Sequence, residues 1–492
     1  MNGVRHAGTG EHTRWQYALP IVAVAGTVLF ALLELRALVL DLFPRVDLVV
    51  AELVLIALGL GIATLVQQQR AGRRYSLLVI YTLIFLSEFV VGTFVATARI
   101  DILWRQQLSS ESVARTLGIA ILGYVALLAG YHLPSLAART TSTRRDDIEA
   151  PQRNSSDFAP RYRLVLFLVL GVTTAFGFVQ LALRIKKAGS FAAYLAIAYT
   201  MRIGTYADTD AANAWAVLAS LLASGALPAA ALLYVAWMRG RLSGFEKWLL
   251  LAMTVALLGR QASTAFRAVV VFTLFSAFAV YDTERRIGMR TLLLMGLVIA
   301  CALIGVNYVH VILHNLTGVG AATSFADSSK ELLAPHAYLE TLARLLEVRD
   351  RMVPLDGKGI FTSIFFFVPR AIWLSKLPSE QFGTGIVQSW AGFPTTYQIA
   401  ISNVGELFVH FGYVGLTGLI AWGLAYRWFD SRWAISLEWR AALLCISAPR
   451  IFADEGMGIS AFAISVASVA AFMLTLAAAT RVSGLGVPRT GT

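Results

Sequence analysis

Long apolar runs with almost no internal charge dominate this chain. Runs of about 17–25 such residues are long enough to cross the hydrocarbon core of a bilayer as helices. Because lipid offers the backbone no hydrogen-bond partner, such runs must satisfy their backbone groups within helices. We therefore predict an all-α, polytopic membrane bundle of about twelve spanning helices. The predicted spans are 16–35, 48–66, 75–97, 115–133, 164–183, 213–237, 246–260, 267–283, 291–312, 404–426, 440–449 and 457–478.

The composition agrees with a membrane bundle rather than with soluble domains. Hydrophobic residues make up 57% of the 492 residues and charged residues only 14%, with a mean hydropathy of +0.68. A soluble domain carries about 25% charged residues because its surface must face water. The only cysteines, Cys301 and Cys445, lie in apolar stretches, which predicts buried free thiols. The first apolar run is long and no cleavage pattern follows it, so we expect a spanning helix and no signal peptide.

The positive charge is distributed in a way that fixes the orientation of the helices. The net charge of +12 comes from scattered residues, with no long basic run and no interleaved aromatics, so we expect no nucleic-acid partner. Basic residues instead fill alternate connections, and short basic connections stay in the cytoplasm. Both termini are then predicted to be cytoplasmic. The residues that set this orientation include Arg70, Arg139, Arg144, Arg153, Arg239, Arg285, Arg427 and Arg481.

The spans and connections divide the chain into six parts. Residues 134–163 are rich in Ser, Thr, Asp, Arg and Pro, which predicts a mobile cytoplasmic linker. The remaining parts are helices 1–4 (1–133), helices 5–9 (164–312), a long extracytoplasmic loop (313–403), helices 10–12 (404–480) and a cytoplasmic tail (481–492).

The long loop 313–403 carries apolar elements of its own, so it does not have the composition of a disordered segment. Glu331–Val348 places leucines at helical spacing and predicts a helix. Phe361–Trp373 is rich in aromatics, too short to span, and interrupted by Pro369, which suits an interfacial or re-entrant element. Loops of this length are usually either functional or disordered, and the apolar elements of this one favour a functional loop.

Several basic residues lie on the predicted outer face, where the orientation rule disfavours them. Arg260 and Arg267 bracket the turn after the seventh helix, with no acid nearby in sequence until Asp282. Arginine at membrane depth faces a cavity or a partner, and its planar fork suits phosphate. Outer acids and lipid headgroups are alternative partners, and that alternative stays open. If the outer arginines do not pair with these groups, they favour an anionic headgroup ligand, with a pyrophosphate-linked lipid as the natural candidate. The other outer basic candidates are Arg202, Arg370, Lys376 and Arg450.

A second candidate site opens the helix that leaves the long loop, in the stretch Asn403–Gly412. Glu406 and His410 are four residues apart and share a helix face. Glu406 lies near the helix start, where the helix dipole favours a carboxylate. The pair is either a first-turn acid packed against a histidine, or a general base and anchor for an acceptor hydroxyl.

Motifs for nucleotides and metals are missing from the sequence. There is no phosphate-binding glycine loop, no dinucleotide pattern, no HExxH and no DxD pair near a cytoplasmic connection. His310 and His314 share a helix face, but no third ligand accompanies them. We therefore expect no metal and no cofactor.

From about residue 160 onward, the order of spans, long loop and basic residues resembles that of the O-antigen polymerase (Wzy) group. Within this group, the resemblance is to the oligosaccharide-repeat-unit polymerase branch. The clearest stretch is Gly359–Gly412, with Val-Pro-Arg-Ala-Ile-Trp before Lys-Leu-Pro, then Gly-Glu-Leu before Phe-Gly. The basic turn from Arg260 to Arg267 and the outer Arg450 fall where the family keeps basic residues. That turn departs from the compact Gly-x-Arg-Gly form of many members.

The resemblance implies a GT-C-like, metal-independent glycosyltransferase at the outer face of the bacterial inner membrane. It would move a glycan from an undecaprenyl-pyrophosphate donor to the sugar of an undecaprenyl-pyrophosphate-linked acceptor. Arg260, Arg267 and Arg450 would grip the leaving pyrophosphate, with Arg202, Arg370 and Lys376 as weaker candidates. Glu406 would orient or deprotonate the acceptor hydroxyl, and His410 would help to bind the glycan. Further implied partners are the bilayer and the flippase and chain-length regulator of the same pathway.

Two other functions remain open at this point. An O-antigen ligase would use the same donor and a lipid A core acceptor, but the Ala-Pro-His-Ala-Tyr context of His336 is unlike a ligase motif. The position of Glu88 inside the third predicted span favours a flippase or transporter. Transporters tend to show repeated halves, and no repeat is visible in the sequence.

Overall fold

The computed structural model of the chain describes residues 48–71, 75–97, 108–141, 158–191, 193–194, 221–262, 337–347, 402–432, 436–447 and 459–482, with isolated positions between 276 and 301. All regular structure in these ranges is helical. Among the described residues, five helices are long and apolar enough to cross a membrane. They are Leu48–Arg70, Leu77–Phe94, Ser110–Leu133, Pro160–Leu183 and Leu221–Met238, and they coincide with five predicted spans. The chain is therefore an α-helical membrane protein.

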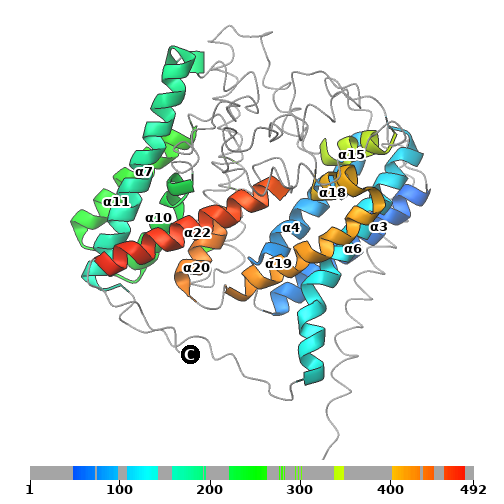
Figure 1. The fold of residues 1–492 in the computed structure, drawn as a ribbon, viewed down its shortest axis with the longest axis horizontal. Coiled ribbons are helices and arrows are strands. Elements are labelled where there is room, and N and C mark those ends of the chain that lie inside the picture. Colours follow the sequence, from blue (N-terminus) through cyan, green and yellow to red (C-terminus); the bar gives the residue numbers. More distant parts are fainter. Residues whose placement is uncertain are drawn as a thin grey trace, which may run out of the picture.

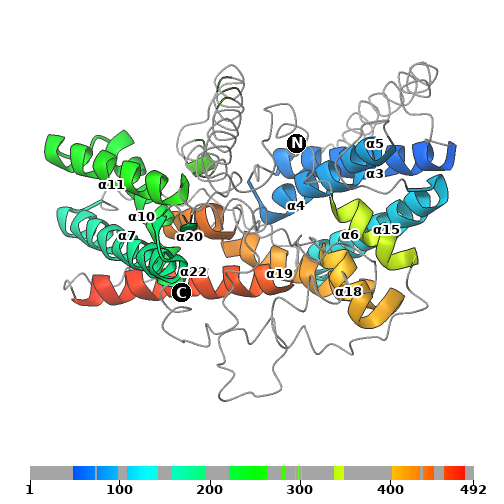
Figure 2. The same ribbon diagram turned by 90° about the horizontal axis from the view of Figure 1, so that it is seen from above.

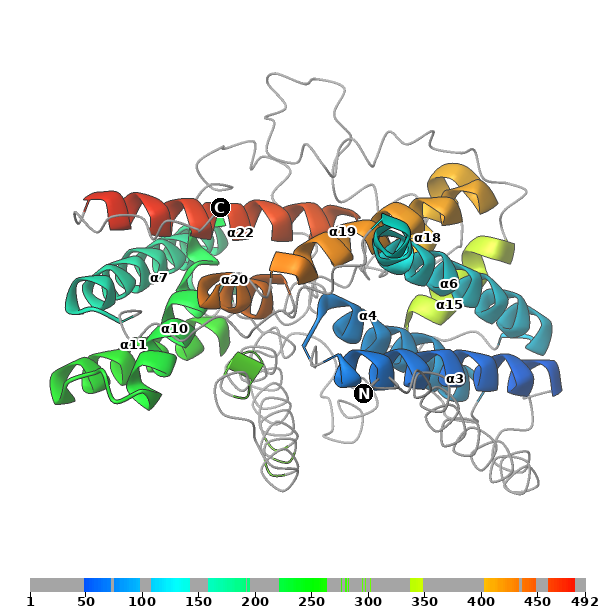
Figure 3. The same ribbon diagram turned by 90° about the horizontal axis from the view of Figure 1, so that it is seen from below.

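The helices gather into two bundles, which lie side by side in Figures 1, 2 and 3. Each bundle has its own cluster of buried apolar side chains. The first bundle contains α3 (Leu48–Arg70), α4 (Leu77–Phe85), the π-helix η1 (Leu86–Val91), α5 (Gly92–Thr97), α6 (Ser110–Thr141), α15 (Ala337–Glu347), α18 (Asn403–Phe411), the 3-10 helix η6 (Gly412–Thr417) and α19 (Gly418–Arg432). The second contains α7 (Pro160–Ala188), α10 (Ala226–Met238), α11 (Gly244–Ala262), α20 (Leu437–Ala442), the π-helix η7 (Leu443–Ser447) and α22 (Ile459–Val482).

The two short predicted spans both fall on helices of the second bundle. The run 246–260 lies within α11, and 440–449 overlaps α20 and η7. The run 457–478 falls largely on α22. The expected spans 16–35, 267–283 and 291–312 lie outside the described residues, apart from isolated positions in the last two, and so does most of the linker 134–163.

The two cysteines differ in their surroundings. Both are free, and Cys445 is buried as its apolar stretch predicts. Cys301 is exposed, so the expectation of a buried thiol is wrong at this position. An apolar stretch in a membrane protein can face lipid as well as other helices, and hydropathy does not distinguish these two environments.

The linker begins later than its composition predicts, because α6 continues through Pro134 to Thr141. Proline removes one backbone donor from a helix and usually bends or ends it. Here Leu136, Ala137 and Ala138 follow after Ser135, and all three are strong helix formers. The helix therefore outlasts the apolar run from which its end was predicted.

In the first bundle, α6 and α19 approach each other so closely that only glycine fits at the contact. A methyl group on Gly130 would collide with the carbonyl oxygen of Ile420, and one on Gly423 would collide with that of Leu127. Small residues allow this approach of backbones in membrane bundles, where packing rather than the hydrophobic effect holds helices together.

A buried aspartate, Asp430, ties three helices of the first bundle together. Its two carboxylate oxygens accept hydrogen bonds from the Leu77 backbone N–H at the start of α4 and from the Tyr131 hydroxyl of α6, each at 2.8 Å. The first N–H groups of a helix have no partner within the helix, so this carboxylate satisfies one of them. The arrangement fixes α4 and α6 against the end of α19.

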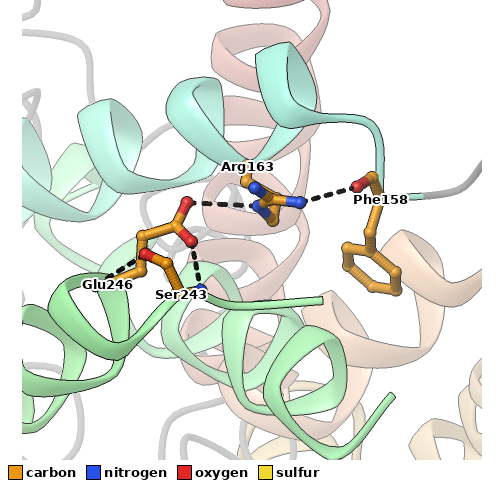
Figure 4. A network of polar contacts seen from close by, with 4 residues as sticks. All are labelled: Phe158, Arg163, Ser243 and Glu246. Atoms are coloured by element: carbon orange, nitrogen blue, oxygen red, sulfur yellow. Dashed lines mark hydrogen bonds and ion pairs between the residues drawn. The ribbon is translucent and has the colours of Figure 1, made fainter. Parts of the chain in front are cut away.

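In the second bundle, an ion pair joins α7 to the beginning of α11 (Figure 4). The Arg163 Nε donates to the Glu246 carboxylate at 3.1 Å. The other Glu246 oxygen accepts from the Ser243 backbone N–H, while the Ser243 hydroxyl accepts from the Glu246 N–H. This reciprocal pair is a capping box, which fixes where α11 begins. One carboxylate thus both caps its own helix and holds the neighbouring one.

Candidate functional site

The predicted span 404–426 is not one continuous helix, and the break creates the most unusual feature of the first bundle. Here α18 ends at Gly412, whose φ of +60° and ψ of −143° belong to a region that essentially only glycine occupies. The chain then turns through η6 into α19. Apart from Glu406 and His410 the run is largely apolar, and its hydropathy does not reveal a reversal of the chain.

The contacts show that α18 folds back along η6 and α19 as an antiparallel hairpin. The Leu407 carbonyl lies against Gly415 and the Leu407 side chain against Gly418. One turn earlier on α18, Val404 meets Gly123 of α6 together with Leu419 of α19. The apex of the hairpin is therefore at Gly412, and the first residues of α18 lie deep among the spanning helices.

The first residue of α18, Asn403, is held by Tyr81, which belongs to a cluster of buried aromatic side chains. The Tyr81 hydroxyl donates to the Asn403 Oδ1 at 3.1 Å, across 322 residues of sequence. The Tyr81 ring stacks on Tyr124, with centroids 6.2 Å apart, and meets Tyr426 edge-on at 5.8 Å. All four residues are buried. Ser402 caps the helix by accepting from the Gly405 N–H at 3.2 Å.

The polar residues of α18 lie on one face and are all buried. Asn403, Glu406 and His410 are spaced three and then four residues apart, which places them on a single stripe of the helix. Their exposed fractions are 0%, 7% and 1%. The shared face of Glu406 and His410 is visible in the sequence. Asn403 belongs to the same stretch, but its hydrogen bond with Tyr81 joins distant parts of the sequence and is visible only in the structure. We call these three side chains the α18 stripe.

Two further buried carboxylates belong to neighbouring elements. Glu88 lies on η1 and Glu340 on α15, and both are buried. The helix α15 packs against α5, η1, α6 and α18, so it bridges the element with Glu88 and the element with the α18 stripe. Within the described residues, no three acidic, histidine or cysteine side chains converge closely enough to hold a metal ion.

The helix α15 falls inside the predicted helix Glu331–Val348, and both α15 and the hairpin apex are tied to the first turns of α6. The Ser112 hydroxyl donates to the Glu347 carboxylate at 3.0 Å, and the Arg115 guanidinium donates to the Tyr413 hydroxyl at 3.4 Å. The predicted orientation puts this end of α6 on the outer side. The helix α15, which belongs to the predicted outer loop, thus lies against α18 and is tied to the same end of α6 as the apex of the hairpin.

Of the six basic residues predicted to bind pyrophosphate, only Arg260 lies within the described residues. Arg260 lies in the last turn of α11, in the second bundle, and only its position on the helix is described. The other five lie outside the described residues; they are Arg202, Arg267, Arg370, Lys376 and Arg450. Of the predicted site residues, the structure therefore brings together Glu406 and His410.

Comparisons with protein-family models, with curated proteins and with solved structures found no match.

Proposed function

We propose that this protein is a polymerase of lipid-linked oligosaccharide repeat units, working at the outer face of the bacterial cytoplasmic membrane. The observation that carries the proposal is the α18 stripe, a carboxylate, a histidine and an amide buried on one face of a re-entrant helix. Polar and ionisable groups at membrane depth are costly, and their presence marks function. The packing of α15 against this helix supports a site roofed by the long loop.

The reaction needs one base and one leaving group. The acceptor hydroxyl oxygen attacks the anomeric carbon of the donor glycan, and its proton passes to the Glu406 carboxylate. The bond from the anomeric carbon to the pyrophosphate oxygen breaks, and undecaprenyl pyrophosphate leaves with the electron pair. His410, one turn beyond Glu406, donates or accepts a hydrogen bond to the bound glycan.

The negative charge that develops on the pyrophosphate is matched by arginines in this proposal. Arg260, Arg267 and Arg450 grip the leaving group, and Arg202, Arg370 and Lys376 are further candidates. Fixed cations beside a leaving group lower the barrier because they interact most strongly where charge develops in the transition state. The resulting product is the longer lipid-linked glycan of an O-antigen, capsule or exopolysaccharide.

Reconstitution in liposomes tests the proposal directly. The purified chain is given an undecaprenyl-pyrophosphate-linked repeat unit, EDTA and no nucleotide sugar, and the glycans are resolved by size. We expect a ladder, with one undecaprenyl pyrophosphate released per linkage. Arg267→Ala is expected to slow the reaction about 100-fold, as loss of a charge-stabilising group does elsewhere. A folded protein that leaves the glycan length unchanged contradicts the proposal.

One observation favours a second candidate, a flippase or transporter of lipid-linked oligosaccharides. Glu88 is buried in a π-helical turn within the span Leu77–Phe94, and π-turns are frequent at functional sites. The division into two bundles also suits alternating access. In the same liposomes, transport would appear as movement of the intact repeat unit between leaflets, without a ladder.

A further inference from the structure

The amide of Asn403 presents a buried hydrogen-bond donor that the described part of the protein leaves unsatisfied. Its Oδ1 accepts from the Tyr81 hydroxyl at 3.1 Å and from the Val404 backbone N–H at 2.8 Å. Its Nδ2 is buried, and no acceptor among the described residues reaches it. A buried donor without a partner is costly, and each one in a folded protein needs an explanation.

The orientation of this amide follows from its partners. A backbone N–H can only donate, so the atom that faces the Val404 N–H must be the oxygen. Turning the amide over would place two N–H donors against each other. The unsatisfied atom is therefore the Nδ2, and Tyr81 and Val404 together hold the side chain in this position.

The neighbour of this donor on the same helix face is Glu406, one turn further along α18. Side chains three residues apart on a helix have Cβ atoms about 5–6 Å apart, so one small group can touch both. A carboxylate has room for several donors, so an additional bond at Glu406 displaces nothing. A hydroxyl group matches the hydrogen-bonding chemistry of these two side chains, because its oxygen accepts from an N–H while its hydrogen is donated to a carboxylate.

We propose that Asn403 binds the acceptor sugar, with its Nδ2 donating to the oxygen of the same hydroxyl whose proton Glu406 accepts. This inference rests on the proposed polymerase function and names the residue that positions the attacking oxygen. The amide orients the oxygen lone pair while Glu406 takes the proton, so the oxygen reaches the anomeric carbon in one fixed direction. Tyr81 is a positioning residue, because its hydroxyl holds the Asn403 oxygen and not the substrate.

Two substrate analogues separate the acceptor step from the donor step. In one analogue, methylene replaces the oxygen that joins the anomeric carbon to pyrophosphate. The pyrophosphate of this repeat unit cannot leave, so the analogue serves only as acceptor. A repeat unit whose acceptor hydroxyl is methylated serves only as donor. The wild-type protein must join the two, and failure to do so contradicts the polymerase function itself rather than the role of Asn403.

Asn403→Asp keeps the size of the side chain and an oxygen facing Val404 but replaces the donor by a second oxygen. We expect kcat/KM for the acceptor analogue to fall about 10- to 100-fold, with the KM for the donor analogue unchanged. Tyr81→Phe keeps Asn403 itself and is expected to lower the same acceptor constant about threefold to tenfold.

Tyr124→Phe is the matched control, because it removes a hydroxyl from the same aromatic stack that bonds to Thr82 and not to Asn403. We expect its acceptor constant to equal that of the wild type. If Asn403→Asp and Tyr81→Phe both leave the acceptor constant unaltered, the Nδ2 is bonded to water alone and the inference is overturned. Equal losses for donor and acceptor, accompanied by a lower Tm, would also overturn it.

Discussion

Replacement of Glu406 by glutamine is expected to stop glycan joining while the protein stays folded. Glutamine keeps the shape of the side chain and one oxygen that accepts a hydrogen bond, but it cannot take a proton from the acceptor hydroxyl. A positioned general base contributes about 100- to 10,000-fold to a rate, and we expect a loss of that size in kcat. The measurement is the initial rate of joining in liposomes, with Tm in detergent as the check on folding.

The control for this prediction is Glu111→Gln, which removes an exposed carboxylate from the first turn of α6. That variant should join glycans at the wild-type rate. A Glu406→Gln protein that is folded and retains more than about a tenth of the wild-type rate would show that Glu406 is not the base.

The second large effect is on stability and concerns the contact between α6 and α19. Gly130→Ala and Gly423→Ala each place a methyl group against a backbone carbonyl, which cannot yield as a flexible side chain would. Overpacking of a well-packed contact costs about 1–3 kcal/mol and occasionally more, and we expect at least this loss for each variant. The measurement is the unfolding transition of the purified protein in detergent.

Gly118→Ala is the matched control, because it lies on the same helix and nothing is within 4 Å of the position of the added methyl group. Alanine also favours the helix over glycine, so this variant should be as stable as the wild type or slightly more stable. If Gly130→Ala is as stable as Gly118→Ala, then the backbone of α6 at Gly130 does not lie against the Ile420 carbonyl of α19.

The features that the sequence predicted are those that depend on local pattern. The five spans were found because apolar length alone decides whether a helix can cross a membrane. The shared face of Glu406 and His410 followed from helical spacing. The expected helix in the long loop contains α15, because leucines at helical spacing require a helix to be buried together.

The features that the sequence did not predict depend on contacts between distant residues. The hairpin at Gly412 has the same hydropathy as a straight span, so only the fold-back onto Gly415 and Gly123 distinguishes the two. The role of Asn403 requires Tyr81, more than 300 residues away in the sequence. The hydrogen bonds from Leu77 and Tyr131 to Asp430, which join three helices, also connect residues far apart in the sequence and leave no local pattern.

The proposed site requires the apex of the hairpin that carries Glu406 to lie at the outer face of the membrane, and one labelling experiment tests this orientation. Val414 lies beside the apex and is 73% exposed, whereas Ser431 is exposed at the far end of α19. Each is replaced by cysteine in a protein whose Cys301 and Cys445 are changed to alanine, and intact cells are treated with a membrane-impermeant maleimide. We expect labelling of Val414→Cys in intact cells and of Ser431→Cys only after permeabilisation. The reverse pattern would place the α18 stripe toward the cytoplasm and contradict transfer at the outer face.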